Sequence, residues 1–346
     1  MNATIRRQIV EQKLKVVKCP PTKVKDAAFL PLLLSVLMPH ETVTFDLFVK
    51  VRQPNGGSVT FLPYYKRGET IRPDWLASLS KLGVDRLYIE KNSLDQVLAY
   101  LNNNLMIHDF EGADSPRKLT ILREHLHLSL HRAFSAPYLG PHIQLASKTL
   151  DKFLASLATN PDSFSLIGQI LYYEYSLYTH SVNVSLLGLA VMIFMRKTRK
   201  ESLLLGLAGL FHDLGMTRIP EDIIYKIEAL QETEREILNK HPCYGYQMLK
   251  ASSAFPLEAL RLVLEHHENA DGSGYPQGLT LSQQHPLTRV LRVLDSYDAL
   301  TCQRPYRPAL KPFAALTLMQ EERGDKGPIF DAAVLKNLIR FLALTG

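Results

Sequence analysis

The sequence feature that most constrains the fold is a series of histidine and aspartate residues in or beside apolar helical segments of the second half of the chain. In chain order the series reads H…HD…H…HH…D and consists of His180, His212, Asp213, His241, His266, His267 and Asp295. A single histidine on an apolar helix face is usually a hydrogen-bonded core residue. Several such side chains aimed into one helical core cost free energy unless they have partners, and a metal ion is one such partner. The series therefore predicts successive helices that can supply a two-metal centre.

The residue types indicate which metals such a centre could hold. Neutral imidazole suits iron, manganese and zinc, and a carboxylate can bridge two cations. The three cysteines, Cys19, Cys243 and Cys302, are far apart in the sequence and form no CxxC pair. Thiolate-bound structural zinc and a disulfide framework are therefore not expected, and a reducing cytoplasm is the predicted location.

Length and periodicity divide the chain into parts. A chain of 346 residues is longer than one ordinary domain. We predict an N-terminal sensory or interaction domain over residues 1–116, connecting helices over 117–160 and the metal-binding helical domain over 161–346. The expected fold class is α+β overall, with a small α/β domain followed by an all-α bundle.

The first part of the chain shows mixed strand and helix patterns. Strands are predicted over Thr42–Val51 and Ser58–Tyr65, joined by the turn Pro54–Gly57, because apolar and polar residues alternate on both sides of a Pro-Asn-Gly-Gly sequence. A helix is expected over Arg72–Leu82 and another strand over Asp85–Glu90. No residue pattern in this part indicates catalytic chemistry.

Helical patterns take over after a predicted linker at Glu111–Pro116. Helices are expected over Arg117–Leu130 and Ile143–Leu157. His127 and His131 have the i, i+4 spacing of a metal-binding pair, but no third ligand lies at a matching spacing. We interpret them as ordinary helix histidines.

Charge and hydropathy exclude some classes of function. The formal net charge of +6 favours anionic ligands but is too small to predict binding of a nucleic-acid polymer. The best candidate for a membrane span, Ala27–Met38, contains Pro31 and is shorter than the roughly 20 residues that a spanning helix needs. The charged N-terminus does not resemble a signal peptide, so neither a span nor a leader is expected.

Several motifs around the histidine series resemble those of the HD-GYP family, a subgroup of the HD metal-dependent phosphohydrolases. The matching segments, in family order, are Leu210–Gly215 (LFHDLG), His241-Pro242, His266–Pro276 (HHENADGSGYP), Asp295–Leu300 (DSYDAL) and Arg304–Arg307 (RPYR). The resemblance covers roughly residues 165 to 340. HD-GYP proteins are bacterial signal-transduction phosphodiesterases that hydrolyse cyclic di-GMP to the linear dinucleotide pGpG and often on to GMP, and their core is an all-helical bundle.

The resemblance implies a role for each residue of the series. In the family pattern one metal is held by His180, His212 and Asp295, the other by His241, His266 and His267, and Asp213 bridges the two. Two divalent transition-metal ions are expected, with iron as the first expectation and manganese as the second. His212 and Asp213 are accordingly the residues implied to be catalytic.

The resemblance also implies substrate contacts and partners. Tyr275, Gly274, Arg304 and Arg307 match positions that contact the substrate or its phosphates in the family, and arginine offers a planar fork of donors that suits a phosphodiester. The implied partners are cyclic di-GMP, proteins that dock on the N-terminal domain or on the GYP loop, and a second copy of the chain in a homodimer. The GYP loop is the segment that contains Gly274-Tyr275-Pro276.

The sequence departs from the family pattern at two positions. The family usually has a lysine where this chain has Met216, and methionine supplies neither its charge nor its donors. Some members carry an acidic ligand for a third metal where this chain has Ser176, so two metals are expected. Three interpretations stay open: an active cyclic di-GMP phosphodiesterase, a degenerate HD-GYP receptor with little or no turnover, and a phosphohydrolase acting on another nucleotide.

Overall fold

A computed structural model describes residues 15–16, 28–52, 59–108, 115–159, 163–171, 176–303, 307–324 and 326–345. The chain divides into two compact units, Met1–Leu128 and Ser129–Gly346, and the division falls inside helix α4 (Ser115–Phe134). The domain boundaries predicted at residues 116 and 160 stay a prediction, because a compact unit need not coincide with a functional domain.

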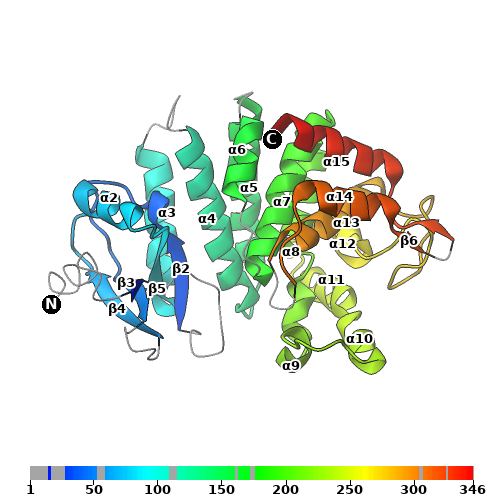
Figure 1. Cartoon of the computed structure of the whole chain (residues 1–346), viewed down its shortest axis with the longest axis horizontal. Coiled ribbons are helices and arrows are strands. Elements are labelled where there is room, and N and C mark those ends of the chain that lie inside the picture. The colour runs from blue at the N-terminus through cyan, green and yellow to red at the C-terminus, as the bar shows by residue number, and fades with distance from the viewer. Residues whose placement is uncertain are drawn as a thin grey trace. The chain divides into compact units, whose positions relative to one another are not determined.

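The described part of the first unit contains an antiparallel sheet, two helices that precede α4, and the first part of α4 (Figure 1). Its sheet has five strands in the order β1-β3-β5-β2, with β4 paired to β3. The strands are β1 (Lys15–Val16), β2 (Phe29–Leu33), β3 (Leu47–Arg52), β4 (Val59–Tyr65) and β5 (Arg86–Glu90), and the helices are α2 (Pro73–Lys81) and α3 (Leu94–Ile107). Short 3-10 turns, η2 (Leu34–Val36) and η3 (Lys91–Ser93), follow β2 and β5.

Most elements predicted for this unit are confirmed. β4, α2 and β5 begin and end within one residue of the predicted bounds. The strand predicted over 42–51 was wrong at its start, because Val43 bonds to Glu69 and Gly68 instead and the sheet pairing begins at Leu47. The predicted turn at 54–57 lies outside the described residues. The apolar run considered as a membrane candidate contributes β2 and η2 to the unit.

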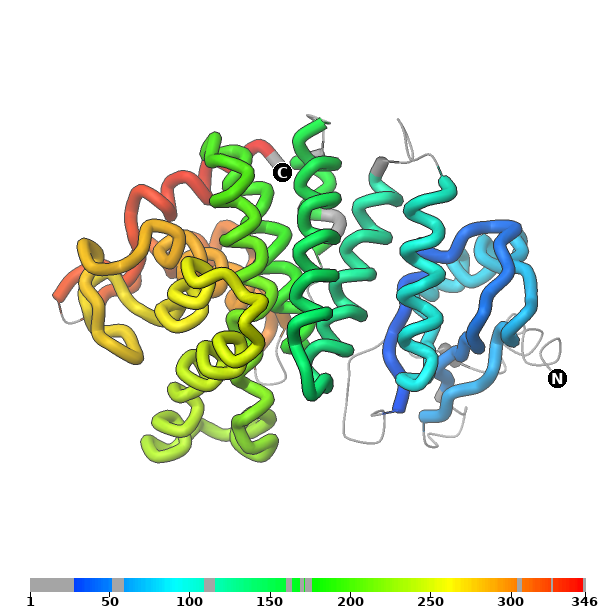
Figure 2. Tube along the Cα trace, turned by 180° about the vertical axis from the view of Figure 1, so that it is seen from behind, coloured from blue at the N-terminus to red at the C-terminus, as the bar shows by residue number. Residues whose placement is uncertain are grey.

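The second unit is a helical bundle, as predicted. It consists of the end of α4, α5 (Gly140–Thr159), α6 (Ser163–Ile170), α7 (Leu177–Phe194), α8 (Arg199–Phe211), the 3-10 turn η5 (Leu214–Arg218), α9 (Glu221–Ile224), α10 (Glu232–Leu238), α11 (His241–Ala251), α12 (Leu257–Glu265), α13 (Pro286–Thr301), α14 (Pro312–Glu321), the hairpin β6 (Arg323–Gly324) and β7 (Gly327–Pro328), and α15 (Ala332–Thr345). Seen from either side, α9 and α10 lie at one end of this unit and α15 at the other (Figures 1 and 2).

Helix α7 forms the centre of the bundle and packs against α8 and α13. It is buried on all sides from Thr179 to Met192, which explains why its sequence lacks a polar face. By length and composition alone, α7 is the one helix of the described chain that could cross a membrane, and 78% of it is buried inside the protein. A core helix meets the same criterion, so packing accounts for its apolar sequence.

The helices predicted over 117–130 and 143–157 correspond to α4 and α5, which extend further at both ends. Residues 111–114 of the predicted linker lie outside the described residues. His127 is buried, and His131 stacks on Tyr178 with ring centroids 3.5 Å apart. Neither belongs to a possible metal-ligand group among the described residues. Cys243 and Cys302 are free thiols, and Cys19 lies outside the described residues.

Candidate metal centre

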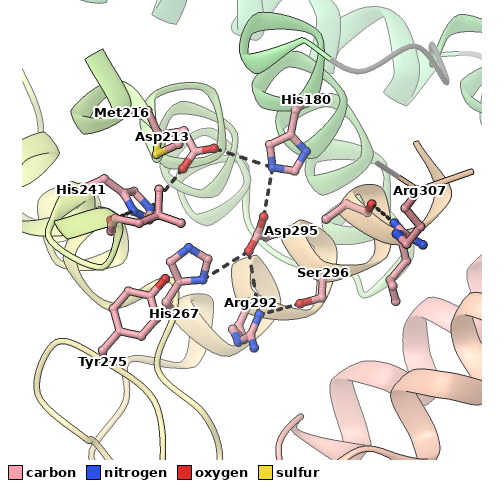
Figure 3. Close-up of a pocket in the computed structure, with 13 residues that line it drawn as sticks. His180, Asp213, Met216, His241, His267, Tyr275, Arg292, Asp295, Ser296 and Arg307 are labelled. Carbon is pink, nitrogen blue, oxygen red and sulfur yellow. Dashed lines mark hydrogen bonds and ion pairs between the residues drawn. The ribbon is translucent and has the colours of Figure 1, made fainter. Parts of the chain in front are cut away.

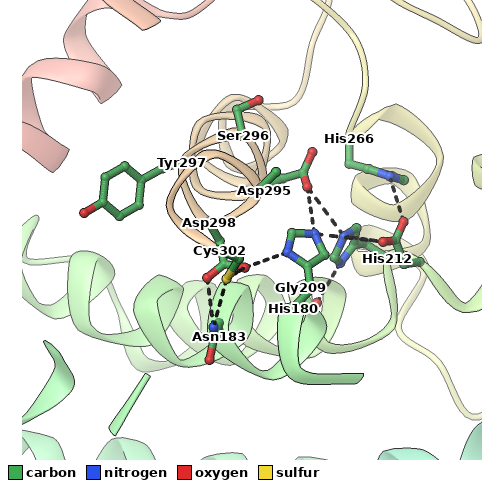
Figure 4. A network of polar contacts seen from close by, with 12 residues as sticks. His180, Asn183, Gly209, His212, His266, Asp295, Ser296, Tyr297, Asp298 and Cys302 are labelled. Atoms are coloured by element: carbon green, nitrogen blue, oxygen red, sulfur yellow. Dashed lines mark hydrogen bonds and ion pairs between the residues drawn. The ribbon is translucent and has the colours of Figure 1, made fainter. Parts of the chain in front are cut away.

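The structure brings together all seven residues of the predicted ligand series (Figures 3 and 4). Their potential ligand atoms form two groups, and within each group these atoms lie within 4.8 Å of one another. The groups are Asp213, His241, His266 and His267, and His180, His212 and Asp295. This partition is the one implied by the family resemblance. That these seven side chains bind metal ions stays a prediction.

Asp213 faces both groups with different oxygen atoms. Its Oδ1 lies 3.3 Å from His241 Nε2 and 3.8 Å from His266 Nε2. Its Oδ2 lies 3.4 Å from His212 Nε2 and 3.9 Å from His180 Nε2. A carboxylate in this position can contact two cations at once, one through each oxygen.

Helix ends position most of the ligand side chains. His212 and Asp213 follow the last residue of α8, His241 is the first residue of α11, and His266 and His267 follow α12. Side chains at helix ends can converge because no further helical turn lies beyond them to keep neighbouring segments apart. Only His180 on α7 and Asp295 on α13 project from within a helix.

A glycine permits the closest of these approaches. A Cβ atom on Gly215 in η5 would lie 2.0 Å from the carbonyl oxygen of His241 and 2.5 Å from the amide nitrogen of Gly245. Contacts this short are impossible for any other residue without backbone movement. Gly215 therefore lets the segment after Asp213 lie directly on the first turn of α11, which carries His241.

Backbone carbonyl groups fix the tautomers of three histidines. In each, Nδ1 donates to the carbonyl oxygen three residues earlier: His212 to Gly209 at 2.8 Å, His241 to Leu238 at 2.8 Å and His266 to Val263 at 2.7 Å. Because a neutral imidazole carries one proton, this bond leaves Nε2 as an unprotonated acceptor. All three Nε2 atoms face the centre.

The Nε2 acceptors of these histidines have no hydrogen-bond donors facing them. This observation bears on whether the site fits a metal ion. The Nε2 atoms of His241 and His266 are 3.1 Å apart, so two lone pairs face each other. The buried Nε2 of His212 has no hydrogen-bond partner among the described residues. Such an arrangement is repulsive unless a proton or a cation lies between the acceptors. A set of imidazole nitrogens and carboxylates with unshared lone pairs fits divalent transition-metal ions.

His180 is oriented differently, by a side chain that the sequence reasoning did not single out (Figure 4). Its Nδ1 donates to Asp298 Oδ2 at 2.7 Å, and its Nε2 lies 3.0 Å from Asp295 Oδ1. Asn183 Nδ2 donates to Asp298 Oδ1 at 2.9 Å, and Cys302 Sγ lies 3.4 Å from Asp298 Oδ2. A carboxylate behind a ligating histidine fixes its orientation and raises its basicity. The i, i+3 spacing of Asp295 and Asp298 was the available signal, because it puts both on one helix face.

The charges of the cluster shift its pKa values. Burial alone would lower the pKa of His180, but its hydrogen bonds to Asp295 and Asp298 raise it to about 10. Burial opposes ionisation of Asp213 too, yet the facing imidazoles of His212 and His241 hold its pKa well below the usual range. Burial and the charges of His212 and His241 lower the pKa of His266 to about 3. Ionised carboxylates therefore coexist with a neutral His266, and a metal that binds His180 would have to displace the proton on its Nε2, which faces Asp295.

The GYP loop folds back onto the centre from the end of α12. Buried Glu268 accepts hydrogen bonds from the amides of Gln277 at 2.7 Å and Leu279 at 2.8 Å, which closes the loop. A Cβ on Gly274 would lie 2.2 Å from the amide nitrogen of Asn269. Packing within the loop thus explains this glycine, and its predicted contact with substrate stays a prediction.

Tyr275 stands at the inner side of this loop, with its ring centroid 4.9 Å from that of His267. Burial, and then the negative charge of Asp295, raise the pKa of its phenol above the usual value. The phenol therefore keeps its proton at neutral pH and can donate a hydrogen bond into the centre.

The cluster opens into a pocket of about 370 Å³. Its described lining includes Met216, Tyr275, Arg292 and Arg307 beside five of the ligand candidates. Arg307 lines the pocket, and its Nη2 donates to the carbonyl oxygen of Ala299 at 2.6 Å; its contact with phosphate stays a prediction. Arg304, the other predicted phosphate contact, lies outside the described residues. Arg292 and Ser296 were not singled out from the sequence.

Ser176 acts as a helix cap. Its hydroxyl accepts a hydrogen bond from the amide of Thr179 at 3.0 Å and so begins α7. A capping role accounts for the serine without a metal.

Comparisons with known proteins relate part of this chain to a known family. Residues 175–334 match the family described as HD domain. A cyclic di-GMP phosphodiesterase of Pseudomonas aeruginosa is 31% identical over 199 residues, which are 58% of this chain and 47% of that protein. The cyclic di-GMP phosphodiesterase response regulator RpfG of Xanthomonas campestris is 35% identical over 145 residues, 41% of this chain and 37% of that protein. A 3′3′-cGAMP-specific phosphodiesterase of Vibrio cholerae is 37% identical over 114 residues, 33% of this chain and 25% of that protein.

The matched region thus spans less than half the length of each of these curated relatives. Among solved structures, an HDG"Y"P protein from Bdellovibrio bacteriovorus superposes with a TM-score of 0.69 over 91% of this chain and 99% of that chain. At 19% identity, this likeness concerns the fold alone. Residues 175–334 therefore form an HD domain, and the order of the motifs within it resembles that of the HD-GYP subgroup.

Proposed function

We propose that this protein hydrolyses cyclic di-GMP at a dinuclear metal centre, to pGpG, GMP or both. The observation that carries the proposal is the position of Asp213, whose two oxygens face two separate groups of buried ligand candidates. The names of the relatives support the substrate class, because several are called cyclic di-GMP phosphodiesterases.

The residues of the chain would divide the work as follows. Two divalent cations held by the seven ligand candidates, with iron expected before manganese, would supply Lewis acidity and lower the pKa of bound water toward neutrality. Asp213 would hold both ions at a fixed separation. Tyr275 would donate a hydrogen bond to a phosphate oxygen, and Arg307 would place a permanent positive charge beside the diester. The predicted cytoplasmic location belongs to the same proposal.

The alternative is a receptor that binds the dinucleotide with little or no turnover. One observation favours it: Met216, which stands where the family usually has lysine, lines the pocket itself. A neutral thioether there offers no charge to a phosphate. The ligand candidates are all present, so binding would survive even if catalysis were weak.

Incubation of the purified full-length protein with manganese or ferrous iron and a cyclic dinucleotide tests the proposal. The substrates are cyclic di-GMP and 3′3′-cGAMP, since relatives are named for each. Chromatography separates pGpG and GMP from the intact dinucleotide. We expect turnover of cyclic di-GMP that Asp213→Asn abolishes, while Asp222→Asn, at an exposed position outside the pocket, keeps it. Stoichiometric binding without product would support the receptor. If the protein neither hydrolyses nor binds either dinucleotide, both functions are refuted.

A further inference from the structure

A cation that neither the sequence motifs nor the comparisons single out lines the pocket beside Asp295. Arg292 is on α13, one turn before Asp295, and lines the same pocket (Figure 3). Its Nη1 lies 3.9 Å from Asp295 Oδ2, and its side chain is 17% exposed. A charge so close to the ligand candidates bears directly on any anion that enters.

Several contacts hold the guanidinium group of Arg292 in place. Nε and Nη2 donate to Asn269 Oδ1 at 3.1 and 3.0 Å, and Nη1 donates to Ser296 Oγ at 2.5 Å. The group also lies 5.1 Å from the ring centroid of Phe330. Neutral partners make these hydrogen bonds, and the carboxylate of Asp295 makes only a longer ion pair of 3.9 Å with Nη1.

Part of its donor capacity stays unused. A guanidinium has five N–H donors, and the three hydrogen bonds to Asn269 and Ser296 account for three of them. No hydrogen bond among the described residues takes the remaining N–H on Nη1 or on Nη2. Two donors on adjacent nitrogens suit two oxygens of one phosphate.

The other described arginine of the pocket also has unused donors. Arg307 gives Nη2 to the carbonyl oxygen of Ala299, and its buried Nη1 has no hydrogen-bond partner among the described residues. Met216 has no charge to offer. What distinguishes Arg292 is its position, because its Nη1 lies 3.9 Å from Asp295, one of the metal-ligand candidates.

We propose that Arg292 binds the scissile phosphate, donating from Nη1 and Nη2 to its non-bridging oxygens. This inference rests on the proposed function, since it requires a phosphodiester at the centre. Arg292 would provide from α13 the positive charge that Met216 does not provide from η5. The competing explanation is purely structural: Arg292 braces the GYP loop through Asn269, with no contact to the ligand.

Four variants of the full-length, metal-loaded protein separate the two explanations. Arg292→Met removes the charge and the donors. Arg289→Met is the matched control, because Arg289 lies one turn earlier on α13, bonds to Gln284 and faces Asp331 outside the pocket. Arg292→Lys keeps the charge without the fork, and Asn269→Ala removes the brace but keeps the guanidinium. Calorimetric titration with a hydrolysis-resistant phosphorothioate analogue of cyclic di-GMP measures affinity, and elemental analysis measures metal content.

We expect Arg292→Met to weaken binding of the analogue about 10- to 150-fold, the range for losing a hydrogen bond to a charged group. Arg292→Lys should fall between Arg292→Met and wild type, and Arg289→Met and Asn269→Ala should stay within about threefold of wild type. Metal content should not change in any variant. Equal losses in Arg292→Met and Asn269→Ala would overturn the inference in favour of bracing. Equal affinities of Arg292→Met and Arg289→Met would also overturn it. If the wild type does not bind the analogue, the proposed function itself fails.

Discussion

Replacing Asp298 by asparagine should weaken metal binding although Asp298 is not itself a ligand candidate. Its Oδ2 accepts the Nδ1 proton of His180, and its Oδ1 accepts from Asn183. An asparagine has one oxygen and one NH₂ group, so it cannot accept from both donors in their present orientation. The substitution therefore forces a rearrangement around His180, which is 2% exposed.

The expected loss of metal affinity depends on which of two rearrangements occurs. If Asn183 turns its amide over, His180 keeps its proton on Nδ1 and loses only the charge behind it, which should cost about tenfold in metal affinity. If the new NH₂ group faces His180 instead, the imidazole must move its proton to Nε2, the atom that lies 3.0 Å from Asp295. A protonated Nε2 cannot bind a metal, and the loss should then approach about a hundredfold, or roughly 2.8 kcal/mol.

The assay is a manganese titration of chelator-stripped protein, followed by calorimetry, with thermal unfolding as a check on folding. Asn183→Ala is the matched control. It removes the other donor to Asp298 but leaves a carboxylate behind His180, so metal affinity should stay within about threefold of wild type. The reasoning is refuted if Asp298→Asn folds normally and binds manganese as tightly as wild type.

The remaining predictions concern the centre and its packing. Asp213→Ala should lower the content of both metals sharply, because both groups of ligand candidates face this carboxylate; elemental analysis showing unchanged metal would contradict this. Met216→Lys should raise turnover of cyclic di-GMP if the pocket accepts the charge; a fall from a robust wild-type rate would show a site adapted to methionine. Gly215→Ala should destabilise folding by at least about 1–3 kcal/mol in urea titration, because its Cβ would lie 2.0 Å from the His241 carbonyl oxygen; an unchanged midpoint would refute that contact.

The seven ligand candidates could be found in the sequence because each stands beside an apolar helical run, where an unpartnered polar side chain is costly. Residues that are adjacent in the sequence, such as His266 and His267, are necessarily close in space. The helices α4 and α5 were likewise predictable from long apolar periods. Their bounds shifted by a few residues, because the ends of a helix lie outside its periodic pattern.

What the sequence did not reveal depends on contacts between distant segments. Arg292 looks like one more charge on an amphipathic helix, and only its hydrogen bonds to Asn269, 23 positions away, bring it to the pocket wall. Asn183 and Asp298 meet across 115 positions for the same reason. The start of β3 was mispredicted because Val43 found partners at Gly68 and Glu69, which no local alternation encodes.

The hydrogen bonds from Nδ1 of His212, His241 and His266 to the main chain have an evolutionary consequence. A carbonyl oxygen is present whatever residue occupies a position, so substitutions at residues 209, 238 and 263 that preserve the helix ends cannot change these tautomers. His180 lacks this protection, since its proton depends on one replaceable carboxylate. Random substitution should therefore damage the centre through the residues around His180 sooner than through those around the other three histidines. A lineage losing metal binding would be expected to show its first changes there.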